Sequence, residues 1–258
     1  MYRIAVVVLL LGSLFSAVAQ SVTTFTVYRD DTEIIIANHA LSADGARSIG
    51  NNQNCEEGIR MTIVYGPAPG MVIATIEETT ITSTLALTRT VVGEDDKNEE
   101  SLEMLPAEVS FKVPGCIDEQ TAIEGSFVTV EQGRTTVLGT HFELPAGAEE
   151  GTLHGPIDLT RQAEDGSEQL TATANELTVV IDSQETTLFG EVSVRSKERT
   201  TTADTLVLDE EAGTATLTGS PARSVKGTDV VEGAVLLYYL DTDDIVVVGG
   251  VQAEFEID

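Results

Sequence analysis

Apolar and polar residues alternate with a period of two along most of the chain after residue 20. This alternation is typical of β-strands with one buried and one solvent-facing side. Helical periodicity is nearly absent, and the strand-favouring residues Thr and Val are abundant. One helical turn at 99–105 is the only exception that we expect to an all-β fold. The pattern predicts strands at 24–29, 32–37, 60–65, 71–77, 80–92, 107–113, 126–131, 135–144 and 152–160.

Gly, Pro, Asn and Asp cluster between these segments, as turns require. The sequence GPAPG at 66–70 predicts a hairpin connection, and GEDDKNEES at 93–101 predicts an exposed loop.

The C-terminal third repeats one theme three times, at 173–192, 202–221 and 233–251. Each copy has a strand, an acidic turn, and a second strand that closes on glycine. A period near 30 residues with this internal order predicts stacked hairpins, and the glycines allow a bend that curls the stack. A looser fourth copy at 141–159 has Gly155 in the closing position. The turn acids are Asp182, Asp209 and Asp241, and the closing glycines are Gly190, Gly219 and Gly249.

Alternation within the copies predicts which side chains face the interior. The inner column is aliphatic and contains no Trp. Stacked copies would join these side chains into a continuous apolar lining. The predicted lining residues are Leu177, Val179, Ile181, Leu188, Val192, Leu206, Leu208, Leu217, Leu236, Tyr238, Leu240, Val246 and Val248.

The repeat resembles the OstA-like family, which includes the LptA and LptC periplasmic proteins of lipopolysaccharide transport and the N-terminal domain of LptD. The resemblance covers roughly 170–255 and is weak before residue 160. It is carried by an Ala-Asp strand, an acidic turn, a strand that closes on Leu-Thr-Gly, and a link to Glu-Gly-Ala. The matching positions are Ala203, Asp204, Leu206, Asp209, Ala215, Leu217, Thr218, Gly219, Gly233, Ile245, Val247 and Gly249.

The resemblance implies a twisted, half-open β-jellyroll whose apolar groove holds acyl chains of lipopolysaccharide or a related envelope lipid. It also implies end-to-end assembly, with itself or with other OstA-like envelope proteins, by pairing of edge strands. The final strand, 246–257, is a candidate edge. Basic residues suited to lipid headgroups lie on the links between copies, where ordinary solvated positions are the alternative. They are Arg195, Lys197, Arg199, Arg223 and Lys226.

The first 19 residues predict export. Arg3 precedes an apolar run, and Ala17 and Ala19 occupy the positions that a signal peptidase recognises. We therefore expect a cleaved signal peptide at 1–19, a periplasmic location, a divergent β region at 20–165 and the repeat region at 166–258. In an oxidising compartment, Cys55 and Cys116 are expected to form a disulfide that closes a 61-residue loop and contributes about 3–4 kcal/mol.

The chain carries 43 acidic and 14 basic residues, a formal net charge of −29. Such a surface excludes nucleic acid as a partner. The acidity favours a less anionic lipid than lipopolysaccharide, or headgroups bridged by divalent cations.

Other chemistry finds little support in the sequence. No nucleophile motif or phosphate loop is present, so we expect no enzyme and no cofactor. The acidic turns at 94–96 and 241–244 lack the spacing of calcium loops. Two of the histidines at 39, 141 and 154, namely His141 and His154, would face each other if their strands pair, but the sequence alone predicts no metal site. Besides the lipid-binding hypothesis, a structural β-solenoid or surface-layer component stays open, and a secreted enzyme on a β-jellyroll has the weakest support.

Overall fold

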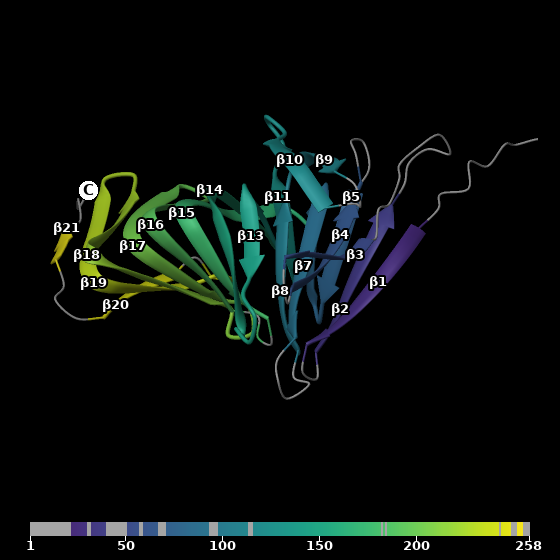
Figure 1. Ribbon diagram of the computed structural model, residues 1–258. Helices are drawn as coiled ribbons and strands as arrows, with labels where there is room; N and C mark the ends of the chain where they lie inside the picture. Colours follow the sequence, from purple (N-terminus) through teal and green to yellow (C-terminus); the bar gives the residue numbers. More distant parts are fainter. Residues whose placement is uncertain are drawn as a thin grey trace, which may run out of the picture.

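The computed structural model describes residues 22–29, 32–39, 51–56, 59–66, 71–92, 98–112, 116–181, 183, 185–242, 244–248 and 252–254. These residues form an all-β structure dominated by one large, open antiparallel sheet (Figure 1). They include no helix that is long and apolar enough to span a membrane. The expected signal peptide lies outside the described residues.

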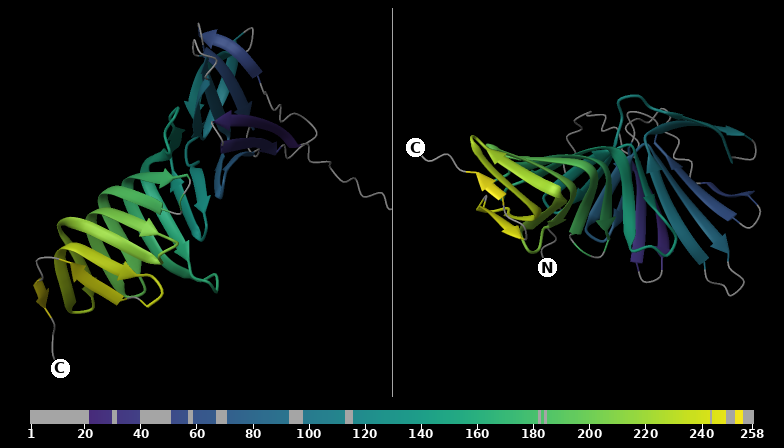
Figure 2. Two further views of the ribbon diagram at one scale, coloured as in Figure 1. Left: turned by 90° about the horizontal axis from the view of Figure 1, so that it is seen from below. Right: turned by 90° about the vertical axis from the view of Figure 1, so that its left-hand side faces the viewer.

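The C-terminal region is a stack of long strands, each antiparallel to the next, as Figure 2 shows. Two short strands, β20 and β21, pair with the two halves of the last long strand. The stack consists of β14 (Glu150–Gln162), β15 (Glu168–Val180), β16 (Glu185–Ser196), β17 (Arg199–Asp209), β18 (Thr214–Lys226), β19 (Asp229–Tyr239), β20 (Asp244–Val248) and β21 (Gln252–Glu254).

The N-terminal region divides into two half-sheets that both end on β14. β12 pairs with the C-terminal half of β14, and β13 pairs with its N-terminal half. The first half-sheet contains, in spatial order, β1 (Val22–Arg29), β2 (Thr32–His39), β5 (Met71–Ile76), β6 (Thr79–Ser83), β11 (Val128–Gln132) and β12 (Thr135–Gly139). The second contains β3 (Asn51–Glu56), β4 (Ile59–Tyr65), β7 (Leu85–Val92), β8 (Asn98–Leu105) and β13 (His141–Leu144).

A hairpin of β9 (Ala107–Lys112) and β10 (Cys116–Ala122) forms a separate two-stranded sheet. Its side chains pack on the outer face of the second half-sheet and bury Met61, Ile63, Leu85 and Leu87. Cys116 is disulfide-bonded. Cys55 is the other cysteine of the chain and lies on β3, with its side chain outside the described residues.

The long strands bend along a line that crosses the stack. Register shifts interrupt five consecutive ladders, and Gly155, Gly190 and Gly219 lie at these shifts. A Cβ atom on Gly155 would lie 2.2 Å from the carbonyl oxygen of Asn175, so only glycine fits there. The expected role of the closing glycines is confirmed at these three positions, whereas Gly249 lies outside the described residues.

Several sequence expectations about the strands need correction. The exposed loop expected at 93–101 overlaps β8, which begins at Asn98, and two strands, β20 and β21, stand where one final strand was expected at 246–257. Residues 99–105 belong to β8 and form no helical turn, because Leu102 and Met104 alternate into the core and both edges of β8 are paired. The segment 80–92 is divided at Thr84 into β6 and β7, and 135–144 is divided at Thr140 into β12 and β13. Each division carries the chain from one half-sheet to the other, which strand-like composition alone does not reveal.

Candidate functional site

A ladder of leucines runs through the interior of the wrapped sheet. Successive strands place leucines directly opposite one another, and each is at most 2% exposed. The ladder comprises Leu153, Leu177, Leu188, Leu206, Leu217 and Leu236. This column of the interior is therefore apolar from β14 to β19, because the register of each ladder places an inward-facing residue opposite an inward-facing residue of the next strand.

Eleven of the thirteen predicted lining residues are buried in this core. They are Leu177, Val179, Ile181, Leu188, Val192, Leu206, Leu208, Leu217, Leu236, Tyr238 and Leu240.

Val246 and Val248 are instead 46% and 51% exposed on β20, so their predicted inward orientation is wrong. Ile245 and Val247 pack against the core in their place. Because four consecutive residues of this strand are aliphatic, alternation in the sequence does not distinguish its two faces. The pairing of Val247 with Leu236 and of Ile245 with Tyr238, both buried, determines which face of β20 points toward the core.

Among the described residues, the inward side chains pack against one another in one cluster. Side chains of β15 to β19 enclose a small cavity of about 10 Å³, which is room for a single water molecule. Both apolar and polar side chains line it: Leu170, Val194, Ser196, Arg199, Thr201, Ala215, Leu217 and Tyr238. In this conformation the cavity is too small for an acyl chain.

A row of buried polar side chains follows one edge of the interior. On each strand concerned, the inward positions are apolar until the strand approaches its turn, where the inward residue becomes polar. On β14, for example, Ile157 and Leu159 are followed by Arg161, and all three are at most 1% exposed. The row comprises Gln132, Thr135, Arg161, Ser196, Thr201 and Ser224.

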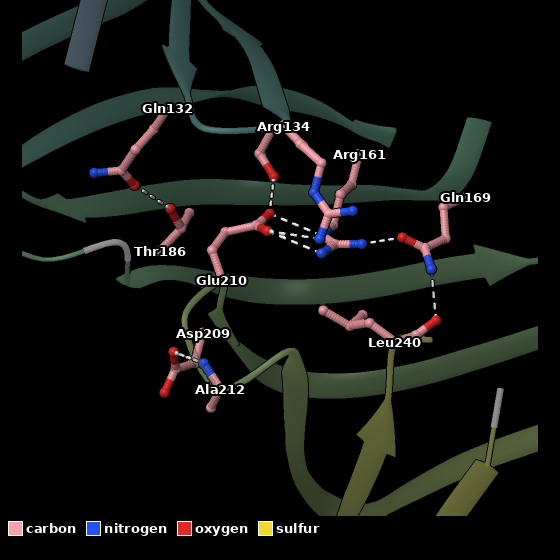
Figure 3. Close-up of polar contacts among 10 residues, drawn as sticks. Gln132, Arg134, Arg161, Gln169, Thr186, Asp209, Glu210, Ala212 and Leu240 are labelled. Atoms are coloured by element: carbon pink, nitrogen blue, oxygen red, sulfur yellow. Dashed lines mark hydrogen bonds and ion pairs between the residues drawn. The ribbon is translucent and has the colours of Figure 1, made fainter. Parts of the chain in front are cut away.

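The polar row meets the turns of the opposite edge and forms a seam (Figure 3). At its centre the guanidinium of Arg161 donates two hydrogen bonds, of 2.8 and 2.9 Å, to the carboxylate of Glu210 in the β17–β18 turn. Thr135 donates a third, of 2.6 Å, to the same carboxylate. The side chains of Arg161 and Glu210 are 0% and 6% exposed, so this is a buried ion pair.

Two glutamines extend the seam on either side of this ion pair. Gln132 donates to the carbonyl of Ser183 at 2.9 Å and accepts from Thr186, which ties the β11–β12 turn to the β15–β16 turn. Gln169 accepts from Arg161 and donates to the carbonyl of Leu240 at 2.5 Å. Side chains therefore close the two edges of the wrapped sheet along the seam, and the described strands form no backbone ladder with each other there.

Farther along the stack, members of the polar row bond to one another and to neighbouring polar side chains near the small cavity. Tyr238 shares a hydrogen bond of 2.5 Å with Ser196, and Thr201 donates to Ser224 at 2.9 Å. Arg199 donates to Ser224 at 3.2 Å, while its buried Nε has no hydrogen-bond partner among the described residues.

Four of the five predicted headgroup residues lie on strands near one edge of the stack, and the fifth lies in a turn at the same edge. The segments between copies are the outer halves of the long strands, in regular ladders. Lys197 lies in the β16–β17 turn, with a φ of 47°. Arg223 forms an exposed ion pair with Glu232. The other three are Arg195 on β16, Arg199 at the start of β17 and Lys226 at the end of β18.

Sequence reasoning missed the seam, although a signal was present. Gln132 and Arg161 occupy the inward phase of strands whose preceding inward residues are aliphatic. A polar or charged residue in that phase is buried and needs a partner. The partner, Glu210, lies 49 positions away from Arg161 and has no distinguishing feature in a chain this acidic.

Comparison of the sequence with known protein families and with curated proteins gives no match.

Proposed function

We propose that this chain is a periplasmic lipid-binding protein of outer-envelope biogenesis, with the half-open β-jellyroll of the OstA-like proteins. Its interior would hold the acyl chains of lipopolysaccharide or a related envelope lipid. One observation carries the proposal: an uninterrupted apolar interior whose edges are joined along the seam by side chains. Each methylene group transferred from water into such an interior contributes about 0.8 kcal/mol.

Loading would require the seam to part, because the cavity between β15 and β19 is too small for an acyl chain. Parting exchanges side-chain hydrogen bonds for bonds to water and leaves the ladders between the strands intact. The Arg161–Glu210 pair makes the exchange unfavourable at rest, and insertion of an acyl chain would offset the cost.

Transfer between molecules would use the open ends of the sheet. Among the described strands, β1 and β3 each pair on one side only, and so do β20 and β21 at the opposite end. Unpaired strand edges bind a neighbour by strand addition. The exposed Val246 and Val248 on β20 add apolar surface at this edge.

The headgroup would lie near the edge that carries the five basic residues. Arg223 is already paired with Glu232, and the chain as a whole is strongly acidic. This balance favours a lipid with few negative charges, or headgroups bridged by divalent cations.

The deciding experiment is mass spectrometry of the organic extract from protein purified without detergent from its own envelope. We expect a stoichiometric acylated lipid. A variant with Gln132→Cys and Ser183→Cys, joined by a short bifunctional thiol reagent, should no longer take up lipid, while the same variant without the reagent should. An empty extract, together with no thermal stabilisation by lipid A, phospholipid or fatty acid, would refute lipid binding.

A second candidate is a structural component that assembles through its edges, and the filled interior favours it. Both candidates use edge pairing, so Val248→Lys should weaken self-association in analytical ultracentrifugation. Phe189→Lys is the matched control, because Phe189 is also exposed but lies on a strand paired on both sides. Association without any lipid in the extract would favour the structural candidate.

A further inference from the structure

Two of the three histidines in the chain meet on the outer face of the sheet. His141 on β13 lies directly opposite His154 on β14, and their ring centroids are 5.5 Å apart. Glu143 is two positions beyond His141 on the same face, and Glu176 on β15 lies directly opposite His154. Because Phe142, Leu153 and Leu177 point into the core, their neighbours in sequence must point outward, which brings the four side chains together.

The spacing of these side chains matches a metal site. Nδ1 of His141 is 3.4 Å from one oxygen of Glu143, and Nε2 of His154 is 3.6 Å from the other. Candidate ligand atoms of the three residues lie within 4.8 Å of one another. Bonds of about 2.0–2.2 Å to a tetrahedral zinc ion place neighbouring ligand atoms about 3.3–3.6 Å apart. Small side-chain adjustments therefore suffice to surround an ion.

Glu176 occupies the position of a supporting carboxylate. One of its oxygens is 3.4 Å from Nδ1 of His154, on the side of the ring opposite Glu143. Metal-bound histidines usually donate their second ring nitrogen to a carboxylate, which fixes the tautomer and the ring orientation. On the other histidine, the buried Nε2 of His141 has no hydrogen-bond partner among the described residues. No hydrogen bond therefore joins this nitrogen to the ring of His154.

We propose that His141, Glu143 and His154 bind a divalent transition-metal ion of the zinc class, with Glu176 orienting His154. Two imidazole nitrogens and a carboxylate suit such an ion, whereas Ca²⁺ and Mg²⁺ prefer oxygen ligands. Three protein ligands leave one position for water or for an external ligand. Within the described ranges, no other group of His, Cys, Asp and Glu has this spacing.

The bound ion would join two parts of the fold. β13 is the strand through which the second half-sheet reaches β14, and their ladder has only three residue pairs. An ion with ligands on both β13 and β14 would cross-link the two strands at this short junction, so metal binding should stabilise the junction. The inference is independent of lipid binding.

The test uses the full chain after treatment with a chelator, titrated with Zn²⁺ in a calorimeter. We expect one site per chain, at least a tenfold loss of affinity in His141→Ala and in His154→Ala, and a smaller loss in Glu176→Gln. His39→Ala is the matched control and should bind like the unmodified chain. Electron paramagnetic resonance with Cu²⁺ should show nitrogen coupling that both histidine variants lose.

Three results would overturn the proposal. They are an absence of saturable Zn²⁺ binding, unchanged affinity in both histidine variants, and displacement of Zn²⁺ by equimolar Ca²⁺. The last two would mean binding to surface carboxylates in general. Circular dichroism of each variant verifies that the fold is retained, as expected for partly exposed side chains.

Discussion

In both the N-terminal and the C-terminal region, the chain must pass between two facing halves of a wrapped sheet. The two regions make this crossing in different ways. The N-terminal region ends one strand and starts another, at Thr84 between β6 and β7 and at Thr140 between β12 and β13. The C-terminal region keeps its strands long and bends them at aligned register shifts, where Gly155, Gly190 and Gly219 lie.

The strand breaks and the glycine bends differ in the contacts made at the crossing. At Thr84 the hydroxyl accepts from the amide of Ala107 at 3.0 Å and donates to its carbonyl at 3.1 Å. Thr140 donates to the carbonyls of His154 and Gly155. The glycine bends instead leave no room for a Cβ atom, because atoms of the neighbouring strand lie too close at Gly155 and Gly190, and atoms of the same strand lie too close at Gly219. A bend by glycine recurs with each copy and is visible in the sequence, whereas a break capped by threonine is not.

The seam joins the two regions, so breaking it should have the largest effect. Arg161→Ala leaves the buried Glu210 with only Arg134, 4.0 Å away, as a cationic partner and should lower the free energy of unfolding by about 3–5 kcal/mol. Urea denaturation measures the change. Arg223→Ala, which removes an exposed ion pair, should cost about 1 kcal/mol or less. Equal losses in the two variants would show that the seam is not closed in solution.

The glycine bend is tested by Gly155→Ala. The new methyl group would meet the Asn175 carbonyl, and overpacking of this kind costs about 1–3 kcal/mol. Gly166→Ala is the control: its φ of +80° is also unfavourable for alanine, but no atom lies within 4 Å. Thermal unfolding should therefore rank Gly155→Ala below Gly166→Ala. The reverse order would mean that the bend adapts to a side chain.

The threonine break is tested by Thr84→Val, which keeps the shape and removes the hydroxyl. The amide of the buried Ala107 then loses its acceptor, and we expect a loss of about 1–2 kcal/mol. Thr140→Val should cost less, because that hydroxyl is exposed and water replaces its contacts. Hydrogen exchange should locate the first change near β9 and the second near β13.

The smallest effect concerns Glu100 on β8, in the N-terminal region. Burial raises the pKa of its carboxyl, against the opposing effects of a hydrogen bond from Thr90 and the charge of Arg60. A carboxyl with a raised pKa in the folded state destabilises the fold above that pKa, and the cost disappears as the pH falls through it. Glu100→Gln should therefore be slightly more stable than the unmodified chain at neutral pH, and the gain should vanish in acid. A gain that persists in acid would contradict this cause.

Sequence reasoning predicted the repeat region well because its signals are local. Alternation placed eleven lining residues, and the period of the glycines located the bends. It failed on β20, where every residue of Ile245–Val248 is aliphatic and the phase is ambiguous. It missed β3 and β10, whose polar sequences (NNQNCE and CIDEQTA) lack a clear apolar alternation.

The sequence by itself determined the all-β class, the hairpin repeat and most of the inward column. These follow from contacts between neighbouring residues and from the two-residue period of a strand. The tertiary structure alone decided the crossing of strands at Thr84 and Thr140, the seam between Arg161 and Glu210, and the grouping of His141, Glu143, His154 and Glu176. Those features depend on which distant segments the wrapped sheet brings together, and local patterns carry no information about distant register.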